Sequence, residues 1–157
     1  DDDLIIDETA IACLRDAWVT TGRVVGMDRR RVIGREKVVY GFDVKKREMY
    51  DIVLTRSMIV SRTLCKRYME HTEMVQYVDE KMNYEDIAMN AVAVKEGARP
   101  PLFVEPGKHR RLLNSIGGIS QIGNQAHQSR IRTEGLRWVT NHLNVTWMST
   151  REIQTCR

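Results

Sequence analysis

The segment from residue 83 to residue 101 is the part of the chain whose local structure is most tightly specified by sequence. Asn83 can cap a helix N-terminus, and Asp86 stands at the N3 position of a capping box. The apolar positions that follow share one helical face: Ile87, Ala88, Ala91, Val92 and Val94. Gly97 suits a helix C-cap, and Pro100-Pro101 prevents the helix from continuing. The segment therefore predicts a helix over residues 83–96 followed by a break.

Helical and strand-like segments alternate along the rest of the chain. Helical periodicity, in the first case preceded by a capping Asp7, predicts further helices over 7–21, 61–70 and 125–143. Short β-branched or aromatic runs predict strands over 23–27, 38–42, 50–55 and 102–104. This alternation predicts an α/β fold, with a mixed sheet and flanking helices.

Three stretches lack such a pattern. Residues 28–37 are strongly basic and are expected to form a loop or an exposed edge. Residues 105–124 hold four of the ten glycines and indicate an irregular, functional loop. The polar tail from residue 144 predicts no regular element.

Charge and aromatic content argue against a nucleic-acid-binding module. The formal net charge is only +4 in 157 residues. Such a module would need basic side chains gathered beside stacking aromatics, and only Tyr40 and Phe42 lie near the basic run. The apolar runs are also too short for a transmembrane helix.

The cysteines do not define a metal site or a disulfide framework. Cys13, Cys65 and Cys156 are widely spaced and include no CxxC pair, which argues strongly against a zinc site. We expect two core thiols and a loose one near the C-terminus. Asn144-Val145-Thr146 is an N-glycosylation sequon, usable only in a secretory compartment, and gives weak support for a lumenal protein.

Two acidic groups could carry chemistry. Asp1-Asp2-Asp3 offers clustered carboxylates, which hard divalent cations prefer, although a solvated acidic terminus has the same sequence. Glu85-Asp86 either borders an active site or complements the dipole of the helix that it begins. Arg132 could clamp a diphosphate, or it could lie on a solvated helix face.

The order of these motifs resembles the C-terminal glycosyltransferase domain of the exostosin family, including the exostosin-like proteins. The acidic triplet is followed about 80 residues later by the segment NYEDIAMN, which begins at Asn83. A Gly-rich loop comes next, and then Arg132-Thr133-Glu134-Gly135. The resemblance covers nearly the whole chain in order and spacing, and EDIAMN is its most specific element.

The resemblance implies a partial GT-A fold, the fold of many nucleotide-sugar transferases. Residues 1–157 would be its C-terminal, metal- and acceptor-side part, and the N-terminal nucleotide-binding half is expected to be missing from this sequence. We therefore expect the chain alone to be inactive. Two family cysteines, which look like disulfide partners, are replaced here by Tyr84 and Gly135.

The resemblance also implies an activity. It is the Mn²⁺-dependent, retaining transfer of an N-acetylhexosamine-type sugar from a UDP-sugar donor to a glycan or glycolipid acceptor. Asp3 would ligate the metal, which would neutralise the departing diphosphate. Asp1 and Asp2 would lie near the ribose, the metal-bound waters and the donor sugar.

Three further residues receive roles from the same resemblance. Arg132 would contact the diphosphate, and Glu85 would hold a hydroxyl of the donor sugar. Asp86 would lie near the anomeric carbon or the acceptor hydroxyl, either as nucleophile or as orienting base. The basic stretch 28–37 could attract an acidic acceptor, although a solvated loop is the simpler interpretation.

The resemblance places the protein in the lumen of the Golgi or endoplasmic reticulum, as part of a type II membrane protein. Membrane association would come only from a missing N-terminal segment. One alternative stays open, a non-catalytic domain that keeps the fold and binds a glycan or a partner. Loss of the cysteine pair favours that alternative, and joint retention of the acidic triplet, Glu85-Asp86 and Arg132 opposes it.

Overall fold

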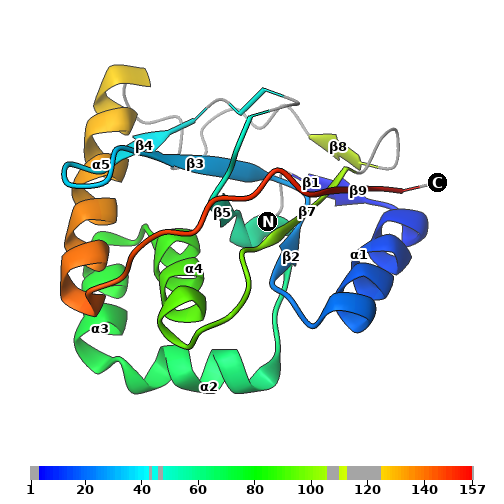
Figure 1. The fold of residues 1–157 in the computed structure, drawn as a ribbon, viewed down its shortest axis with the longest axis horizontal. Coiled ribbons are helices and arrows are strands. Elements are labelled where there is room, and N and C mark those ends of the chain that lie inside the picture. The colour runs from blue at the N-terminus through cyan, green and yellow to red at the C-terminus, as the bar shows by residue number, and fades with distance from the viewer. Residues whose placement is uncertain (1–3, 43, 46–47, 106–109, 113–124, 157) are drawn as a thin grey trace.

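The computed structural model describes residues 4–42, 44–45, 48–105, 110–112 and 125–156. Short strands cross the molecule, and helices pack beside and beneath them (Figure 1). Parallel and antiparallel strand pairs both occur, so the α/β fold with a mixed sheet and flanking helices is confirmed. The acidic triplet at residues 1–3 and most of the Gly-rich loop lie outside the described residues.

The strands fall into three groups. In the first, β2 pairs antiparallel with β6 and parallel with β7, which in turn pairs parallel with β9. In the second, β3 lies between β4 and β5, antiparallel to both. In the third, β1 pairs antiparallel with β8. The strands are β1 Leu4–Ile6, β2 Val25–Gly26, β3 Arg29–Ile33, β4 Val39–Gly41, β5 Ile52–Val53, β6 Met58–Ile59, β7 Leu102–Glu105, β8 Arg110–Leu112 and β9 Ile153–Thr155.

The helices largely follow their local signals. Asp7 caps α1 by accepting a hydrogen bond from the backbone N–H of Ala10 at 2.9 Å, and Gly22 ends α1 in the left-handed region. Ser61 caps α2 in the same way through Leu64. Helix α3 follows almost without a break and was not predicted. The helices are α1 Glu8–Thr21, α2 Arg62–Glu70, α3 Thr72–Lys81, α4 Glu85–Lys95 and α5 Gln125–Leu143, with a 3₁₀ turn, η1, at Thr55–Ser57.

The predicted capping box at the start of α4 is wrong. The helix begins at Glu85, and the residue before it, Tyr84, has a left-handed backbone with φ of 78°. The side-chain oxygen of Asn83 accepts the backbone N–H of Tyr84 at 2.9 Å, so this turn occupies the side chain that was expected to cap the helix. Asp86 consequently lies in the first turn without closing a capping box.

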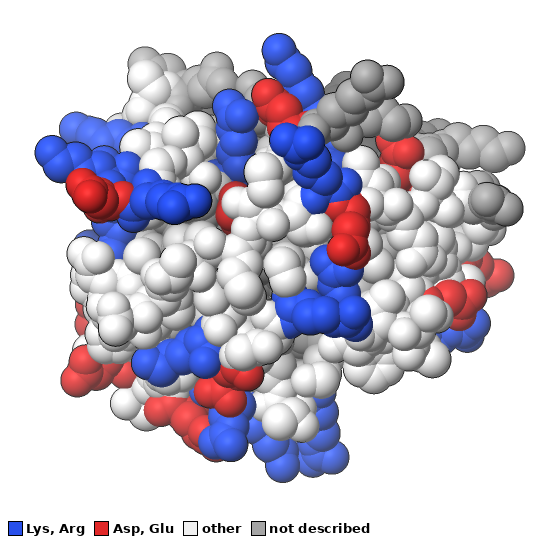
Figure 2. Space-filling model, in the orientation of Figure 1, with Lys and Arg blue, Asp and Glu red and all other residues white. Residues whose placement is uncertain are grey.

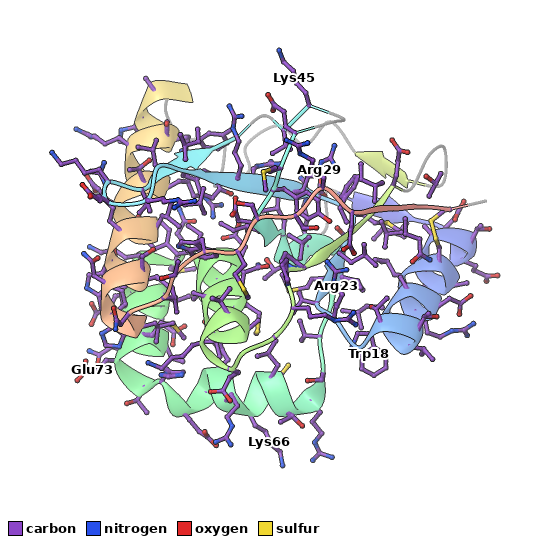
Figure 3. All side chains as sticks on the ribbon, viewed as in Figure 1. Trp18, Arg23, Arg29, Lys45, Lys66 and Glu73 are labelled. Carbon is purple, nitrogen blue, oxygen red and sulfur yellow. A yellow bond between two sulfur atoms is a disulfide. The ribbon has the colours of Figure 1, made fainter. Side chains whose placement is uncertain are left out.

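The basic stretch 28–37 is not simply an exposed loop. Its first half forms β3, the central strand of its group, and only residues 34–37 form an exposed turn. The guanidinium of Arg29, labelled in Figure 3, is buried and lies 4.3 Å from the centre of the Phe103 ring. Stacking on aromatic rings from distant segments allows this strand to carry Arg29 into the interior.

The C-terminal tail also contains an element that its polar composition did not predict. Residues 153–155 form β9, which extends the first group of strands by pairing with β7. Buried Arg23 supports this edge, because its guanidinium donates to the carbonyls of Pro100 and Pro101 and pairs with Glu152. The tail is therefore held by tertiary contacts rather than by local propensity.

Two apolar cores lie on either side of the first strand group. The α1 core packs α1 against β2 and β7 and consists of Ala10, Leu14, Ala17, Val25, Met27, Leu102 and Val104. The larger α4–α5 core packs α2 to α5 against β3, β4 and β5, with Ile87, Val92, Leu136 and Val139 among its fully buried side chains. The separation is visible in Figure 1, where α1 lies apart from α3, α4 and α5.

The expectation of unpaired core thiols is wrong. Cys13 of α1 and Cys156, just after β9, form a disulfide across 143 positions of sequence. The remaining cysteine, Cys65, is free and exposed. The pairing depends on β9 running beside the α1 core, which spacing alone could not show.

Two further expectations concern a membrane-spanning helix and a basic surface. Among the described residues, no helix is both long and apolar enough to cross a membrane. On the face shown in Figure 2, basic and acidic side chains are interspersed rather than gathered into one basic surface.

Candidate active site

The carboxylate of Asp86 is almost completely buried. It lies in the first turn of α4, and its side chain is 2% exposed. Its Oδ1 accepts hydrogen bonds from the backbone N–H of Ile87 at 2.9 Å and from Nη1 of Arg132 at 2.8 Å. The Tyr40 hydroxyl donates to Oδ2 over a longer distance of 3.4 Å. Three elements, α4, α5 and β4, therefore converge on one carboxylate.

Arg132 and Tyr40 are held in place around this carboxylate. Arg132 lies on α5 with its guanidinium carbon 5.8 Å from the centre of the Tyr40 ring. The backbone N–H of Tyr40 donates to Oγ1 of Thr133 at 3.1 Å, which ties β4 to α5. The sequence named Asp86 and Arg132 separately, and the structure joins them in an ion pair.

Burial and charge set the protonation of this cluster. Burial of the Arg132 guanidinium lowers its pKa, but the negative charges around it, first that of Asp86, outweigh this effect and leave the pKa above its ordinary value. Burial and the neighbouring Asp86 carboxylate raise the pKa of the Tyr40 phenol. Arg132 is therefore a fixed cation, and Tyr40 is a neutral hydrogen-bond donor at physiological pH.

The end of the EDIAMN segment fixes the position of α4. Nδ2 of Asn90 donates to the backbone carbonyls of Val53 at 2.8 Å and Asp86 at 2.7 Å. Its Oδ1 accepts the backbone N–H of Val53 at 3.2 Å. This buried amide joins α4 to the edge of β5, and it holds the turn that carries Asp86.

Glu85 takes a different direction from its neighbour. It is exposed, and its Oε1 accepts a hydrogen bond from the hydroxyl of Thr55, in η1, at 3.0 Å. The structure therefore separates the two acidic residues of the motif. Asp86 is committed to Arg132, whereas Glu85 remains at the surface.

Tyr84 and Gly135, which replace the two cysteines expected from the resemblance, are in contact. A Cβ atom placed on Gly135 would lie 2.6 Å from Cγ of Tyr84. Since Cγ is bonded to the tyrosine Cβ at about 1.5 Å, the two Cβ positions can be at most about 4.1 Å apart, which does not exceed the separation that a disulfide spans. A large residue and a residue without a side chain thus fill a space that two cysteines could bridge.

A surface hollow of about 490 Å³ adjoins this contact. Its wall combines aromatic side chains with groups that can form hydrogen bonds. The residues are Tyr77, Lys81, Asn83, Tyr84, His127, Gln128, Ile131 and Glu134. It lies between α3 and the first half of α5, beside the helix that carries Arg132.

Sequence reasoning named some of the cluster and missed the rest. It named Asp86, Arg132 and Glu85, but gave no role to Tyr40 or Asn90. Asn90 could have been found, because it closes the most specific motif. Tyr40 had no signal of its own, since its contact with Asp86 spans 46 positions.

Residues 1–3, where the metal site is expected, lie outside the described part of the chain. Within that described part, no group of three or more histidine, cysteine, aspartate or glutamate side chains is placed to hold a metal ion. The roles expected for Asp1, Asp2 and Asp3 therefore stay predictions. The first described strand, β1, begins directly after them.

Comparisons with known proteins agree on one kind of protein. Residues 1–142 match the model of the glycosyl transferase family 64 domain. The chain is also 28% identical over 149 residues to the glycosyltransferase family protein 64 C3 of Arabidopsis thaliana. That alignment covers 87% of the chain and 41% of the relative, so the chain spans less than half the relative's length. The family match includes the acidic triplet, the EDIAMN segment and Arg132.

Proposed function

Since the chain belongs to the glycosyl transferase family 64 domain family, we propose that it transfers an N-acetylhexosamine-type sugar from a UDP-sugar to a glycan or glycolipid acceptor. Membership makes the chain part of a glycosyltransferase, and the mixed α/β fold is compatible with one. The finer assignment, in which transfer retains configuration and depends on Mn²⁺, rests on the resemblance of the motifs to those of the exostosin family. The observation that carries the proposal is the buried ion pair of Asp86 and Arg132, one from each of the two motifs.

The ion pair suits the charge changes of sugar transfer. A departing diphosphate gains negative charge, which a guanidinium stabilises when it is already in place. A guanidinium has five N–H donors. Of the donor nitrogens of Arg132, only Nη1 forms a hydrogen bond to a described residue, and its partner is Asp86. The remaining donors can bind phosphate oxygens while Asp86 keeps the guanidinium oriented.

Asp86 would act at the reacting carbon or at the acceptor hydroxyl. The backbone hydrogen bond from Ile87, the anchoring of α4 by Asn90 and the Tyr40 hydroxyl together restrict its position. A carboxylate restricted in this way can orient or deprotonate an attacking hydroxyl. Glu85, exposed one residue earlier, would bind a hydroxyl of the donor sugar.

The acidic triplet fits a divalent cation by the chemistry of its donors. Three adjacent carboxylates supply only oxygen ligands, which Mn²⁺ and Mg²⁺ accept. Asp3 would ligate the ion, and Asp1 and Asp2 would bind its waters, the ribose and the donor sugar. When bound, the metal would supply charge neutralisation at the diphosphate.

The proposal is tested by replacing Asp86 with asparagine in the complete protein. Asp86→Asn keeps the shape of the side chain and removes its charge, so sugar transfer should be lost while Mn²⁺-dependent UDP binding persists. Asp79→Asn, an exposed change on the neighbouring helix α3, is the matched control and should transfer at the parent rate. Near-parent transfer by Asp86→Asn would remove this carboxylate from the reaction.

The metal site is tested separately by calorimetry. Asp3→Ala should abolish Mn²⁺-dependent UDP binding, whereas Asp16→Ala, an exposed aspartate on α1, should bind as the parent does. Unchanged UDP binding by Asp3→Ala would make the triplet an ordinary acidic segment.

One observation favours the non-catalytic alternative as a second candidate. Asp86 is buried and already paired, an arrangement that also suits a purely structural ion pair. UDP-sugar hydrolysis by the complete protein separates the two functions. A family fold that binds a glycan without hydrolysing any UDP-sugar would support the second candidate.

We further propose that the protein works in the lumen of the Golgi or endoplasmic reticulum. The disulfide between Cys13 and Cys156 supports this location, since such bonds persist mainly in oxidising compartments.

A further inference from the structure

We infer that Asn144 is an N-glycosylation site, which goes beyond the proposed transfer activity. The residue opens the triplet Asn144-Val145-Thr146, and no other Asn-x-Ser/Thr triplet occurs in the 157 residues. A sequon by itself is weak evidence. The structure adds three independent features: accessibility, backbone geometry and room for a sugar.

Both side chains that a sequon needs are accessible. Asn144 and Thr146 are exposed and lie in the irregular segment that follows α5. Neither side chain forms a hydrogen bond to any residue that the structure describes. The acceptor amide and the hydroxyl beside it can therefore enter an oligosaccharide-transferring enzyme without disruption of the fold.

The backbone at the sequon is a turn that projects from the end of a helix. Asn144 has a left-handed backbone with φ of 51°, and its N–H donates to the carbonyl of Asn141 at 3.2 Å. The next N–H, of Val145, donates to the carbonyl of Thr140 at 3.1 Å. These bonds form the C-cap of α5, where asparagine is one of the residues that tolerate the left-handed region.

The surface beside the sequon has room for the first sugar. A shallow hollow of about 440 Å³ lies against Asn144 and is lined by Val94, Lys95, Gly97, Leu143, Val145, Thr146 and Met148. A sugar on Asn144 could cover part of this apolar lining. The attachment point also lies far from the candidate active site. Arg132 precedes Asn144 by twelve positions, or roughly 18 Å along α5.

The modification is a balanced group transfer. Nδ2 of Asn144 would attack the anomeric carbon of an oligosaccharide carried on a lipid diphosphate. A C–N bond forms, the bond from that carbon to the diphosphate oxygen breaks, and the lipid diphosphate leaves with the electron pair. The amide nitrogen gives up one proton. This reaction is performed on the chain by another enzyme and does not depend on the transfer activity proposed for the chain itself.

The test is expression of the full chain in eukaryotic cells with an added secretory signal sequence. Digestion with a peptide N-glycosidase should increase the mobility of the parent by the step of one glycan. Asn144→Gly should lack this step, since glycine keeps the left-handed turn but has no acceptor amide. Thr146→Val should also lack it, whereas Thr146→Ser should retain it.

Two outcomes would overturn the inference. One is a secreted parent whose mobility is unchanged by digestion. The other is a glycosidase-sensitive step that persists in both Asn144→Gly and Thr146→Val. Because Thr146→Val nearly preserves side-chain shape and leaves the turn unchanged, it also separates loss of the sequon from failure to fold. Failure of the sugar-transfer proposal would alter none of these results.

Discussion

The two cores of the molecule are secured by different means. The α1 core is closed by a covalent bond, because the Cys13–Cys156 disulfide ties the first helix to the chain beyond β9. The α4–α5 core contains no disulfide among its described residues, and its helices meet through the Asp86–Arg132 ion pair and the contact of Tyr84 with Gly135. The disulfide thus ties α1 to the segment after β9, whereas packing and charge hold the core that contains the candidate active site.

The contrast is sharpest at the Tyr84–Gly135 contact. The positions implied as a disulfide pair by the resemblance to exostosin lie close enough here for a bridge. In place of the bridge, the Tyr84 ring stacks on Tyr77, which stacks in turn on Trp138 at a centroid distance of 3.9 Å. An aromatic stack therefore supports the helices where a covalent bond is expected in related proteins.

Removal of the disulfide should have the largest effect on stability. Cys13→Ala with Cys156→Ala opens a loop of 143 residues, and chain-entropy arguments give about 5 kcal/mol for a loop of this size, with 2–5 kcal/mol typical of native bridges. We expect the free energy of unfolding, measured by urea denaturation, to fall by that typical amount. UDP-sugar transfer by the complete protein should change little in the folded fraction, because Asp86 and Arg132 belong to the other core.

The third cysteine supplies the matched control for that experiment. Cys65 is free and exposed, so Cys65→Ala should alter stability by less than about 0.5 kcal/mol. Equal stability of the double variant and Cys65→Ala would show that the bond does not secure the α1 core.

Introducing a methyl group at Gly135 should have the next largest effect. The added Cβ would lie 2.5 Å from Cδ1 of Tyr84, a buried ring that cannot move aside easily. Overpacking of this kind costs about 1–3 kcal/mol, and urea unfolding of Gly135→Ala should show it. In a Tyr84→Ala background the same substitution should stabilise by about 1 kcal/mol, because alanine is the better residue within a helix. Destabilisation of equal size in both backgrounds would contradict the pairing of the two residues.

How much of these two cores the sequence could predict depends on how local each signal is. Asp7, Ser61 and Pro100-Pro101 act within a few residues, and the helices they bound were predicted. Cys13–Cys156, Arg29 on Phe103, and β9 beside β7 are contacts between distant segments, and each of them was missed. A polar tail becomes a strand, and a basic stretch becomes a central strand, only once their partners are in place.

The candidate site shows the same division. The motifs named Asp86 and Arg132 as functional residues, but no local pattern indicated that they form a pair across 46 positions. The cap expected of Asn83 failed because its side chain serves the Tyr84 turn instead. Motifs therefore located the chemistry, whereas the geometry required the folded chain.

Cysteines at positions 84 and 135 should give the α4–α5 core a disulfide, as the α1 core has. Tyr84→Cys with Gly135→Cys should form a bridge under oxidising conditions, which a thiol assay in a Cys65→Ala background would detect as no free thiol. Closing a loop of about 50 residues contributes about 4 kcal/mol in the entropy model, and loss of a buried aromatic ring costs about 3–5 kcal/mol. The oxidised variant should therefore match the parent within about 1–2 kcal/mol and lose stability on reduction. Two persistent free thiols in the folded variant would refute the inferred proximity.

Alkaline pH should produce the smallest and most selective difference between the cores. Burial and nearby negative groups, Tyr77 and Glu134, raise the pKa of Tyr84 to about 12, and the pKa of Tyr40 is raised as well. A phenol whose folded pKa exceeds its unfolded value of 10.0 contributes stability that is fully present below pH 10 and is lost as the pH rises through about 12. The α1 core, as the described residues define it, contains no tyrosine, so it should open later. Trp138 and Trp147 both pack against the α4–α5 core, whereas Trp18 packs against the α1 core. In a Cys65→Ala background, Trp138→Phe with Trp147→Phe should remove the first alkaline change in tryptophan fluorescence, and Trp18→Phe should leave it in place. Tyr84→Phe should move this change to higher pH. Loss of the first change in Trp18→Phe instead would place the alkali-sensitive region in the α1 core.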